Sequence, residues 1–280
     1  MASAAKTGLL KLLPCFLFLL GGCVSGTAPS SQVTVRDLSS SAALEKFMKA
    51  DRTGDAFKAI ARIEIGVGKR RYPLKAALML KLPSFMRIET IPIIGPPDFL
   101  LSLNNDTLKV LLPEKNEFYQ GRPSRDIFAL FLPVSLPPED IVPVLMGVPP
   151  PRLTGQNLRF QEVTADDKYH IDVLSPEGGK IMTLRMDRGN GHLTDMEAFA
   201  AYGVIIYQAS YSEYYQDGNI ELPGKITVIS PETDSMISVR YSDMELSRDV
   251  DEASFELAIP FGMKPITLDG EGGVPPGADR

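Results

Sequence analysis

The residue types that most often carry catalysis or bind metals are scarce in this chain. It contains two histidines, His170 and His192, and two cysteines, Cys15 and Cys23. His170 lies in an alternating, strand-like stretch, and His192 follows a predicted Gly-Asn-Gly turn. Neither histidine has a second one at the spacing of a metal site, and no Gly-x-Ser-x-Gly, phosphate-loop or Cys-x-x-Cys motif occurs. We therefore expect no enzyme, no metal and no cofactor; a catalytic triad assembled in space, making the protein a hydrolase, is the alternative.

Cys23 stands at the end of a secretory signal. Two lysines accompany an apolar segment from Leu9 to Leu20, and two glycines and the cysteine follow. These are the parts of a signal peptide, residues 1–22, and the apolar run is shorter than the roughly 20 residues that span a bilayer. The sequence Leu-Gly-Gly-Cys resembles a bacterial lipobox. The resemblance implies that Cys23 is acylated on its thiol and amine after cleavage; an ordinary signal with an incidental cysteine is the alternative.

The lipobox resemblance also predicts a location. In the bacterial sorting rule, an aspartate directly after the acylated cysteine retains a lipoprotein at the inner membrane, but Val24 and Ser25 follow Cys23. We therefore expect a lipid anchor in the bacterial outer membrane, on its periplasmic face. Several acyl chains bury enough methylene groups, at about 0.8 kcal/mol each, to anchor a protein without a transmembrane helix.

The charge of the chain narrows the class of molecule that it could bind. The chain has 29 basic and 35 acidic residues, a net charge of −6, and losing Lys6 and Lys11 with the signal leaves 27 basic residues and a charge of −8. An acidic chain argues against binding to nucleic acid, which needs a basic surface.

Cys23 is the one cysteine of the mature chain, so no intramolecular disulfide can form and stability must come from a packed core.

From residue 57 onward, apolar and polar residues alternate with the period of a strand. The pattern predicts two long strands, 57–67 and 72–81, around a turn. Shorter strands with turn residues between them are predicted at 85–91, 99–103, 108–112 and 117–120, and again near 157–163, 168–174, 180–187, 193–200, 203–214, 224–230 and 235–246. Such a series is typical of an antiparallel meander, and hence of a sandwich or barrel.

Short helices interrupt the strands. Ser41 would cap a helix over 42–50, and Ser124 one over 125–130. A further helix opens at Pro137-Pro138 and ends at Gly147, and Pro143 inside it predicts a kink or a very short helix.

The helix pair in the middle of the chain decides the expected domain organisation. This pair is apolar on one side and lies between the two strand series, so one domain over 41–268 explains the order better than two. Residues 23–40, the lipidated cysteine and a segment rich in Ser, Thr, Pro and Gly, predict a flexible tether. Residues 269–280 predict a disordered tail.

Three segments, in this order, resemble the LolA/LolB superfamily of periplasmic lipoprotein carriers and receptors. Residues 86–95 resemble a strand that leads into the protruding loop of the outer-membrane receptor LolB. Residues 134–149 resemble the family's lid helix, and residues 251–262 resemble the closing segment of LolA-type carriers. The chain departs from the receptor in its length and in having no tryptophan.

The resemblance implies a mainly β fold with short helices (α+β): an incomplete, curved antiparallel β-barrel covered by a helical lid over an apolar cavity. It places Ile93 and Ile94 on a protruding loop that receives or inserts lipid; a buried strand corner is the alternative. The lid and cavity residues that it implies to bind lipid, with plain core packing as the alternative, are Ile127, Leu130, Phe131, Leu136, Ile141, Val144 and Leu145.

The implied function is chaperone-like transport in lipoprotein localisation. The protein would bind the acyl chains of lipoproteins or lipids, delivered by a soluble periplasmic carrier, in an apolar cavity and pass them to the membrane. The alternative is an outer-membrane lipoprotein that uses the same fold as a structural or protein-binding module in envelope assembly.

Overall fold

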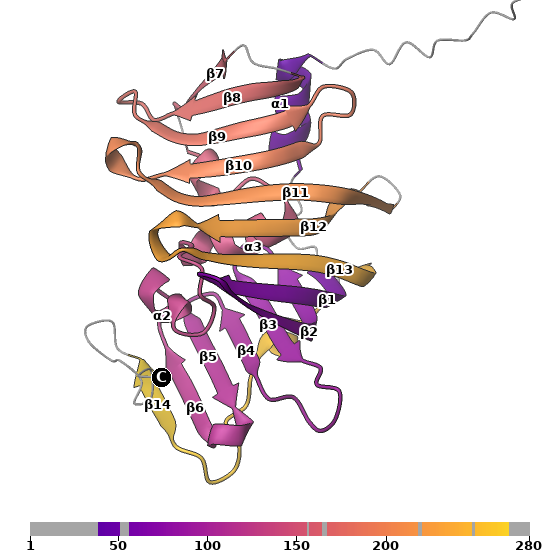
Figure 1. Ribbon diagram of the computed structural model, residues 1–280, viewed down its shortest axis with the longest axis vertical. Helices are drawn as coiled ribbons and strands as arrows, with labels where there is room; N and C mark the ends of the chain where they lie inside the picture. Colours follow the sequence, from indigo (N-terminus) through magenta and orange to yellow (C-terminus); the bar gives the residue numbers. More distant parts are fainter. Residues whose placement is uncertain are drawn as a thin grey trace, which may run out of the picture. The chain divides into compact units, whose positions relative to one another are not determined.

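The alternating segments form one large sheet in the computed structural model (Figure 1). The structure describes residues 39–50, 56–155, 157–163, 167–217, 220–247 and 250–268. The predicted signal peptide, Cys23, most of the tether and the tail at 269–280 lie outside the described residues.

Within this part of the chain, strands pair in the order β14-β6-β5-β4-β3-β2-β1-β13-β12-β11-β10-β9-β8-β7. The sheet is curved and does not close, and its neighbours are antiparallel except for the parallel pair β14–β6. The strands of the first series are β1 (Ala56–Val67), β2 (Arg70–Lys81), β3 (Phe85–Thr90), β4 (Leu100–Asn104), β5 (Thr107–Leu112) and β6 (Glu117–Gly121). Those that follow the central helices are β7 (Arg159–Val163), β8 (Lys168–Leu174), β9 (Lys180–Asp187), β10 (Leu193–Phe199), β11 (Ile205–Asp217), β12 (Ile220–Ser230), β13 (Ser235–Ser247) and β14 (Pro265–Leu268).

The two strand series meet where β1 pairs with β13. Ile63 lies opposite Val239 in this pair, and Ala56 lies opposite Ser247 near the other end. Every other antiparallel pair joins strands that are consecutive in the chain. The predicted mainly β fold, an unclosed antiparallel barrel with short helices, is therefore confirmed.

The sheet has an inner face that the helices cover and an outer face opposite to it. Ile63, Leu78 and Val239 belong to the inner face and pack in the main core with residues of the helices. The helices are α1 (Ser40–Met48), α2 (Arg125–Ala129) and α3 (Pro138–Met146). None of the helices in the described part of the chain is long and apolar enough to cross a membrane.

Several predicted boundaries differ from the structure. Helix α1 is capped by Ser39 and not by Ser41, because the Ser39 hydroxyl accepts a 3.2 Å hydrogen bond from the amide of Ala42. The strand predicted from residue 203 begins at Ile205, after a short 3-10 turn in which Tyr202 has a positive φ of 61°. Strand β14 was not predicted, since its four residues are too few to show a period.

Candidate functional site

An apolar cavity of about 50 Å³ lies between the central helices and the inner face of the sheet. Its lining residues are all apolar. From the helices and the segment that joins them come Phe128, Leu132, Val134, Leu136, Ile141 and Leu145, and from the sheet come Ile63, Leu78, Ile88, Val228, Ile237 and Val239. The cavity is too small to hold a ligand, so an acyl chain could enter only if the helices moved.

A groove of about 1030 Å³ lies beside this cavity. Its apolar side chains come from β1, β2, β3 and β5, from the loop between β3 and β4, and from the loop after α2. They are Ile63, Ile65, Leu74, Ile88, Ile91, Ile93, Phe99, Leu112, Phe131 and Leu132. Ile63, Ile88 and Leu132 line both spaces and therefore form the wall between them. Leu132 lies in the loop after α2, so the position of this loop sets one part of that wall.

Helix α3 is held at its N-terminal end by a buried ion pair. The carboxylate of Asp140 is fully buried, lies 2.7 Å from the Arg152 guanidinium and accepts a 3.1 Å hydrogen bond from the Tyr207 hydroxyl. Burial raises the pKa of the Asp140 carboxyl, and Arg152 and Tyr207 offset this only in part. Its second oxygen has no hydrogen-bond partner in the described part of the chain.

The C-terminal end of α3 lies against the sheet. Gly147 ends the helix with a φ of 65°, and a Cβ at this position would lie 2.7 Å from the side chain of Pro223 on β12. The Tyr241 hydroxyl donates a 2.8 Å hydrogen bond to the carbonyl of Leu145. With Asp140 at the other end, α3 is fixed at both ends.

Helix α2 is held by weaker, more exposed contacts. The Ser124 hydroxyl caps it by accepting from the amide of Ile127, as predicted. Arg125 donates to Ser135 Oγ at 2.6 Å and pairs with Glu232 at 2.7 Å, and both partners of this ion pair are more than a third exposed. Of the two helices above the cavity, α2 and the residues after it are therefore the part that can move at lower cost.

The seven predicted lid residues occupy different positions. Leu136, Ile141 and Leu145 line the cavity, and Phe131 lines the groove. The ring of Phe131 packs edge-on against that of Tyr119, with 5.3 Å between the ring centroids. Ile127 and Val144 are buried in the core but line neither space.

The placement of Leu130 toward the cavity was wrong. Its side chain is 41% exposed and lines neither space. Helix α2 ends at Ala129, so Leu130 is already its C-cap, and Phe131 and Leu132 take the inward positions.

The loop that follows β3 carries the two other predicted residues. Ile93 and Ile94 are exposed, so this loop is not a buried strand corner. Ile93 lines the groove as well. Their role in receiving or inserting lipid stays a prediction.

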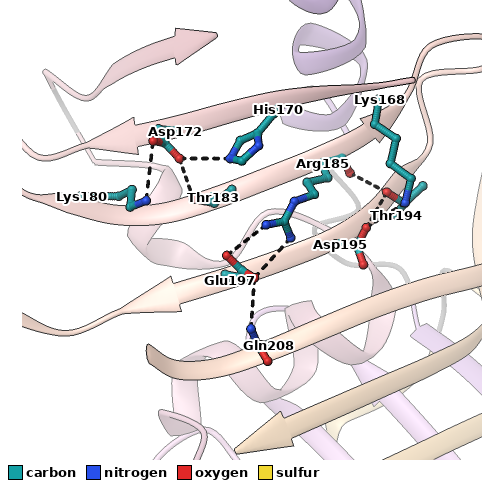
Figure 2. Close-up of polar contacts among 10 residues, drawn as sticks. All are labelled: Lys168, His170, Asp172, Lys180, Thr183, Arg185, Thr194, Asp195, Glu197 and Gln208. Carbon is teal, nitrogen blue, oxygen red and sulfur yellow. Dashed lines mark hydrogen bonds and ion pairs between the residues drawn. The ribbon is translucent and has the colours of Figure 1, made fainter. Parts of the chain in front are cut away.

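On the outer face of β8 to β11, acidic side chains contact basic and polar side chains from other strands (Figure 2). Lys168 lies 3.1 Å from Asp195, and Arg185 lies 3.2 Å from Glu197. His170 lies 3.6 Å from Asp172, and Thr183 donates its hydroxyl to that same carboxylate at 2.6 Å. In a catalytic triad the hydroxyl bonds to the histidine, so these three residues do not have that order.

His192 takes part in a structural contact. Its ring stacks on that of Tyr214 with 4.0 Å between the ring centroids, and its Nε2 lies 3.0 Å from a carboxylate oxygen of Glu221. Among the residues that the structure describes, no group of three or more His, Cys, Asp or Glu side chains could hold a metal ion.

Comparisons with known proteins identify the fold. No family model matches the sequence, and no curated protein matches it either. A DUF1329 family protein from Desulfovibrio piger covers 76% of this chain and 94% of its own, with a TM-score of 0.53 and 14% identity. A domain from Vibrio parahaemolyticus that is named for outer-membrane lipoprotein sorting has the same coverage and TM-score, with 12% identity.

A LolA superfamily protein from Nitrosomonas europaea covers 79% of this chain and 98% of its own, with a TM-score of 0.52 and 14% identity. The chain has the fold of the LolA superfamily. The resemblance inferred from the sequence is thereby confirmed for the fold. At these identities the likeness concerns the fold alone.

Proposed function

We propose that this chain is a periplasmic lipoprotein, anchored in the outer membrane through acylated Cys23, that carries acylated cargo. It binds the acyl chains of lipoproteins or lipids and passes them to the membrane, without catalysing a reaction. The observation that supports the proposal is the groove of about 1030 Å³ beside the helix-covered cavity. Its volume lies at the upper end of the usual range for ligand sites, about 300–1000 Å³.

Transfer would be driven by affinity. An acyl chain gains about 25 cal/mol for each Å² of its surface that leaves water, whichever apolar groove takes it up. A soluble periplasmic carrier would present the chain at the groove. Displacement of α2 and Leu132 would then lengthen the groove into the cavity, and the membrane would take the chain in the last step.

Photocrosslinking in cells tests this proposal on the full-length protein. Phe131 is replaced by benzoyl-phenylalanine, which keeps an aromatic ring where the groove is lined. The matched control places the same residue at Tyr202, which is fully exposed. We expect acylated adducts, identified by mass spectrometry, from position 131 and not from position 202.

A pair of charge substitutions completes the experiment. Leu145→Glu puts a carboxylate into the apolar cavity and should lower the adduct yield at position 131 about tenfold or more. Leu130→Glu makes the same change on an exposed neighbouring residue and should leave the yield unchanged. Equal yields of acylated adduct at positions 131 and 202 would contradict the proposal, and adducts with unacylated protein alone would favour a protein-binding module.

A further inference from the structure

Four basic residues form a row across the outer face of the sheet. Arg62 on β1 lies opposite Lys75 on β2 and opposite Arg240 on β13, and Arg240 lies opposite Lys225 on β12. Neighbouring strands are about 4.8 Å apart, so the row spans roughly 14 Å. Lys75, Arg62 and Arg240 are exposed and Lys225 is half-buried.

This row is unfavourable for the fold by itself. Like charges directly opposite each other on neighbouring strands destabilise a sheet. Glu213 pairs with Arg240 at 2.8 Å, and Glu64 lies 3.8 Å from Arg71. In the described part of the chain, Arg62, Lys75 and Lys225 have no ion pair.

Elsewhere on the same face, charges are arranged to cancel. On β8, β9 and β10 each lysine or arginine drawn in Figure 2 contacts an aspartate or glutamate. The whole chain is acidic, with a net charge of −6. A local excess of cations in such a protein does not stabilise the sheet. Features that cost stability in this way concentrate at functional sites.

The basic row lines the same groove as the apolar residues. Arg62, Lys75, Lys225 and Arg240 belong to its lining together with Leu74, Ile65 and Phe99. Strand β3 pairs with β2 only over Ala76–Lys81, so among the described strands Arg70–Leu74 have a neighbour on the β1 side alone. The lining of the groove thus includes residues of this free edge of β2, apolar residues of the inner face and basic residues of the outer face.

The remaining charges of the groove do not cancel the row. Glu64 is shared with Arg71, and Asp98 accepts a hydrogen bond from the Thr90 hydroxyl. Glu114 and Lys115, which also line the groove, are adjacent in the chain and carry opposite charges. The lining therefore holds five basic and three acidic side chains, namely Arg62, Lys75, Lys115, Lys225 and Arg240 against Glu64, Asp98 and Glu114.

From this geometry we infer that the ligand is an anionic amphiphile, with its phosphate or carboxylate head on the basic row and its acyl chain in the apolar part of the groove. The inference rests on the proposed function and adds the charge of the ligand to it. Guanidinium and ammonium groups bind phosphate and carboxylate by charge-assisted hydrogen bonds. An anion at Arg62 would also relieve its repulsion with Lys75 and Arg240.

Two photoactivatable probes test this on the full-length protein in phosphatidylcholine nanodiscs. One is a single-chain alkyl phosphate with a diazirine at the end of its chain, and the other has the same chain and diazirine with an uncharged glycerol head. We expect the phosphate probe to crosslink about tenfold more at equal concentration, a difference of about 1.4 kcal/mol. The crosslinked peptides should contain groove residues such as Leu74, Phe99 or Phe131.

Two triple variants separate the row from general charge effects. Arg62→Gln, Lys75→Gln and Lys225→Gln together should remove the preference for the phosphate probe and leave labelling by the glycerol probe unchanged. The matched control, Lys69→Gln, Arg122→Gln and Lys264→Gln, changes the net charge equally at exposed positions outside the groove and should keep the preference. Circular dichroism melting of each variant shows that the fold is retained.

The outcomes distinguish this inference from the proposed function. Equal labelling by both probes in the wild-type protein would overturn the inference and leave the proposed function standing. Labelling by neither probe would overturn both. If millimolar inorganic phosphate fully suppressed labelling by the phosphate probe, the row would be a site for free anions, and the inference would be overturned. It would also be overturned if the triple variant of the row kept the preference for the phosphate probe and lost only binding to vesicles of anionic lipid.

Discussion

At the scale of single residues, the buried pair of Asp140 and Arg152 decides how firmly α3 is held. Asp140 is fully buried, whereas the Arg152 side chain keeps 21% of its exposure. Removing one partner of a buried pair leaves the other without its counter-charge, while removing both can be nearly neutral.

We therefore expect Asp140→Leu to lower the free energy of unfolding by about 3 kcal/mol. The double variant Asp140→Leu, Arg152→Leu should recover most of this loss. Urea unfolding followed by circular dichroism measures both. A double variant no more stable than Asp140→Leu would show that the pair does not act as a unit.

Sequence reasoning found some site residues and could not find others. Leu136, Ile141 and Leu145 were named because the family resemblance places a lid helix within 134–149, and all three line the cavity. The basic row was not found, since Arg62 and Arg240 are far apart in the chain and only strand register brings them together. The alternation of apolar and polar residues in 57–67 predicted a strand but not which strand pairs with it.

At the scale of elements, the segment with Asp251–Glu256 crosses the outer face of β3, β4 and β5. The Arg87 guanidinium donates to the carbonyls of Ser254 and Glu256, at 3.0 and 2.7 Å. The Glu256 carboxylate accepts from Lys109 at 2.7 Å and from Asn104. The hydrogen bond from Lys109 holds the pKa of Glu256 below its usual 4.5.

A depressed carboxyl pKa predicts a direction for the effect of pH. The contribution of Glu256 is fully present above its unfolded pKa of about 4.5 and is lost as the pH falls through its lower, folded value. At pH 6, Glu256→Gln should therefore speed amide hydrogen exchange over 250–258, after correction for intrinsic rates. The difference from wild type should shrink below about pH 4, and a difference that persists there would contradict this account.

The elements themselves were largely predictable. Helix α3 was predicted with its end at Gly147, because proline at the start and glycine at the end are strong signals. Strand pairing was less accessible: the parallel contact of β14 with β6 joins segments far apart in the chain. A Cβ on Gly121 would lie 2.4 Å from the carbonyl oxygen of Leu268, so this contact depends on glycine, yet nothing local in the sequence shows it.

At the scale of the whole molecule, Cys23 should decide where the protein resides. Cys23→Ala removes the thiol that the lipobox resemblance assigns to acylation. We expect loss of metabolic palmitate labelling and loss of the protein from the outer-membrane fraction. Cys15→Ala, the matched control inside the signal peptide, should change neither. Retention of Cys23→Ala in the outer-membrane fraction would refute anchoring through this residue.

The β1–β13 pair also bears on how the molecule reaches its folded state. Its partners, such as Ala56 and Ser247, belong to the first strand and to the last long strand of the described sheet, while most other pairs join consecutive strands. Hairpins close fast and pairings between distant segments close slowly. A chain that crosses the inner membrane from its N-terminus would therefore expose one edge of β1 until the last long strand arrives, and during that interval the protein would depend on periplasmic chaperones to avoid edge-to-edge aggregation.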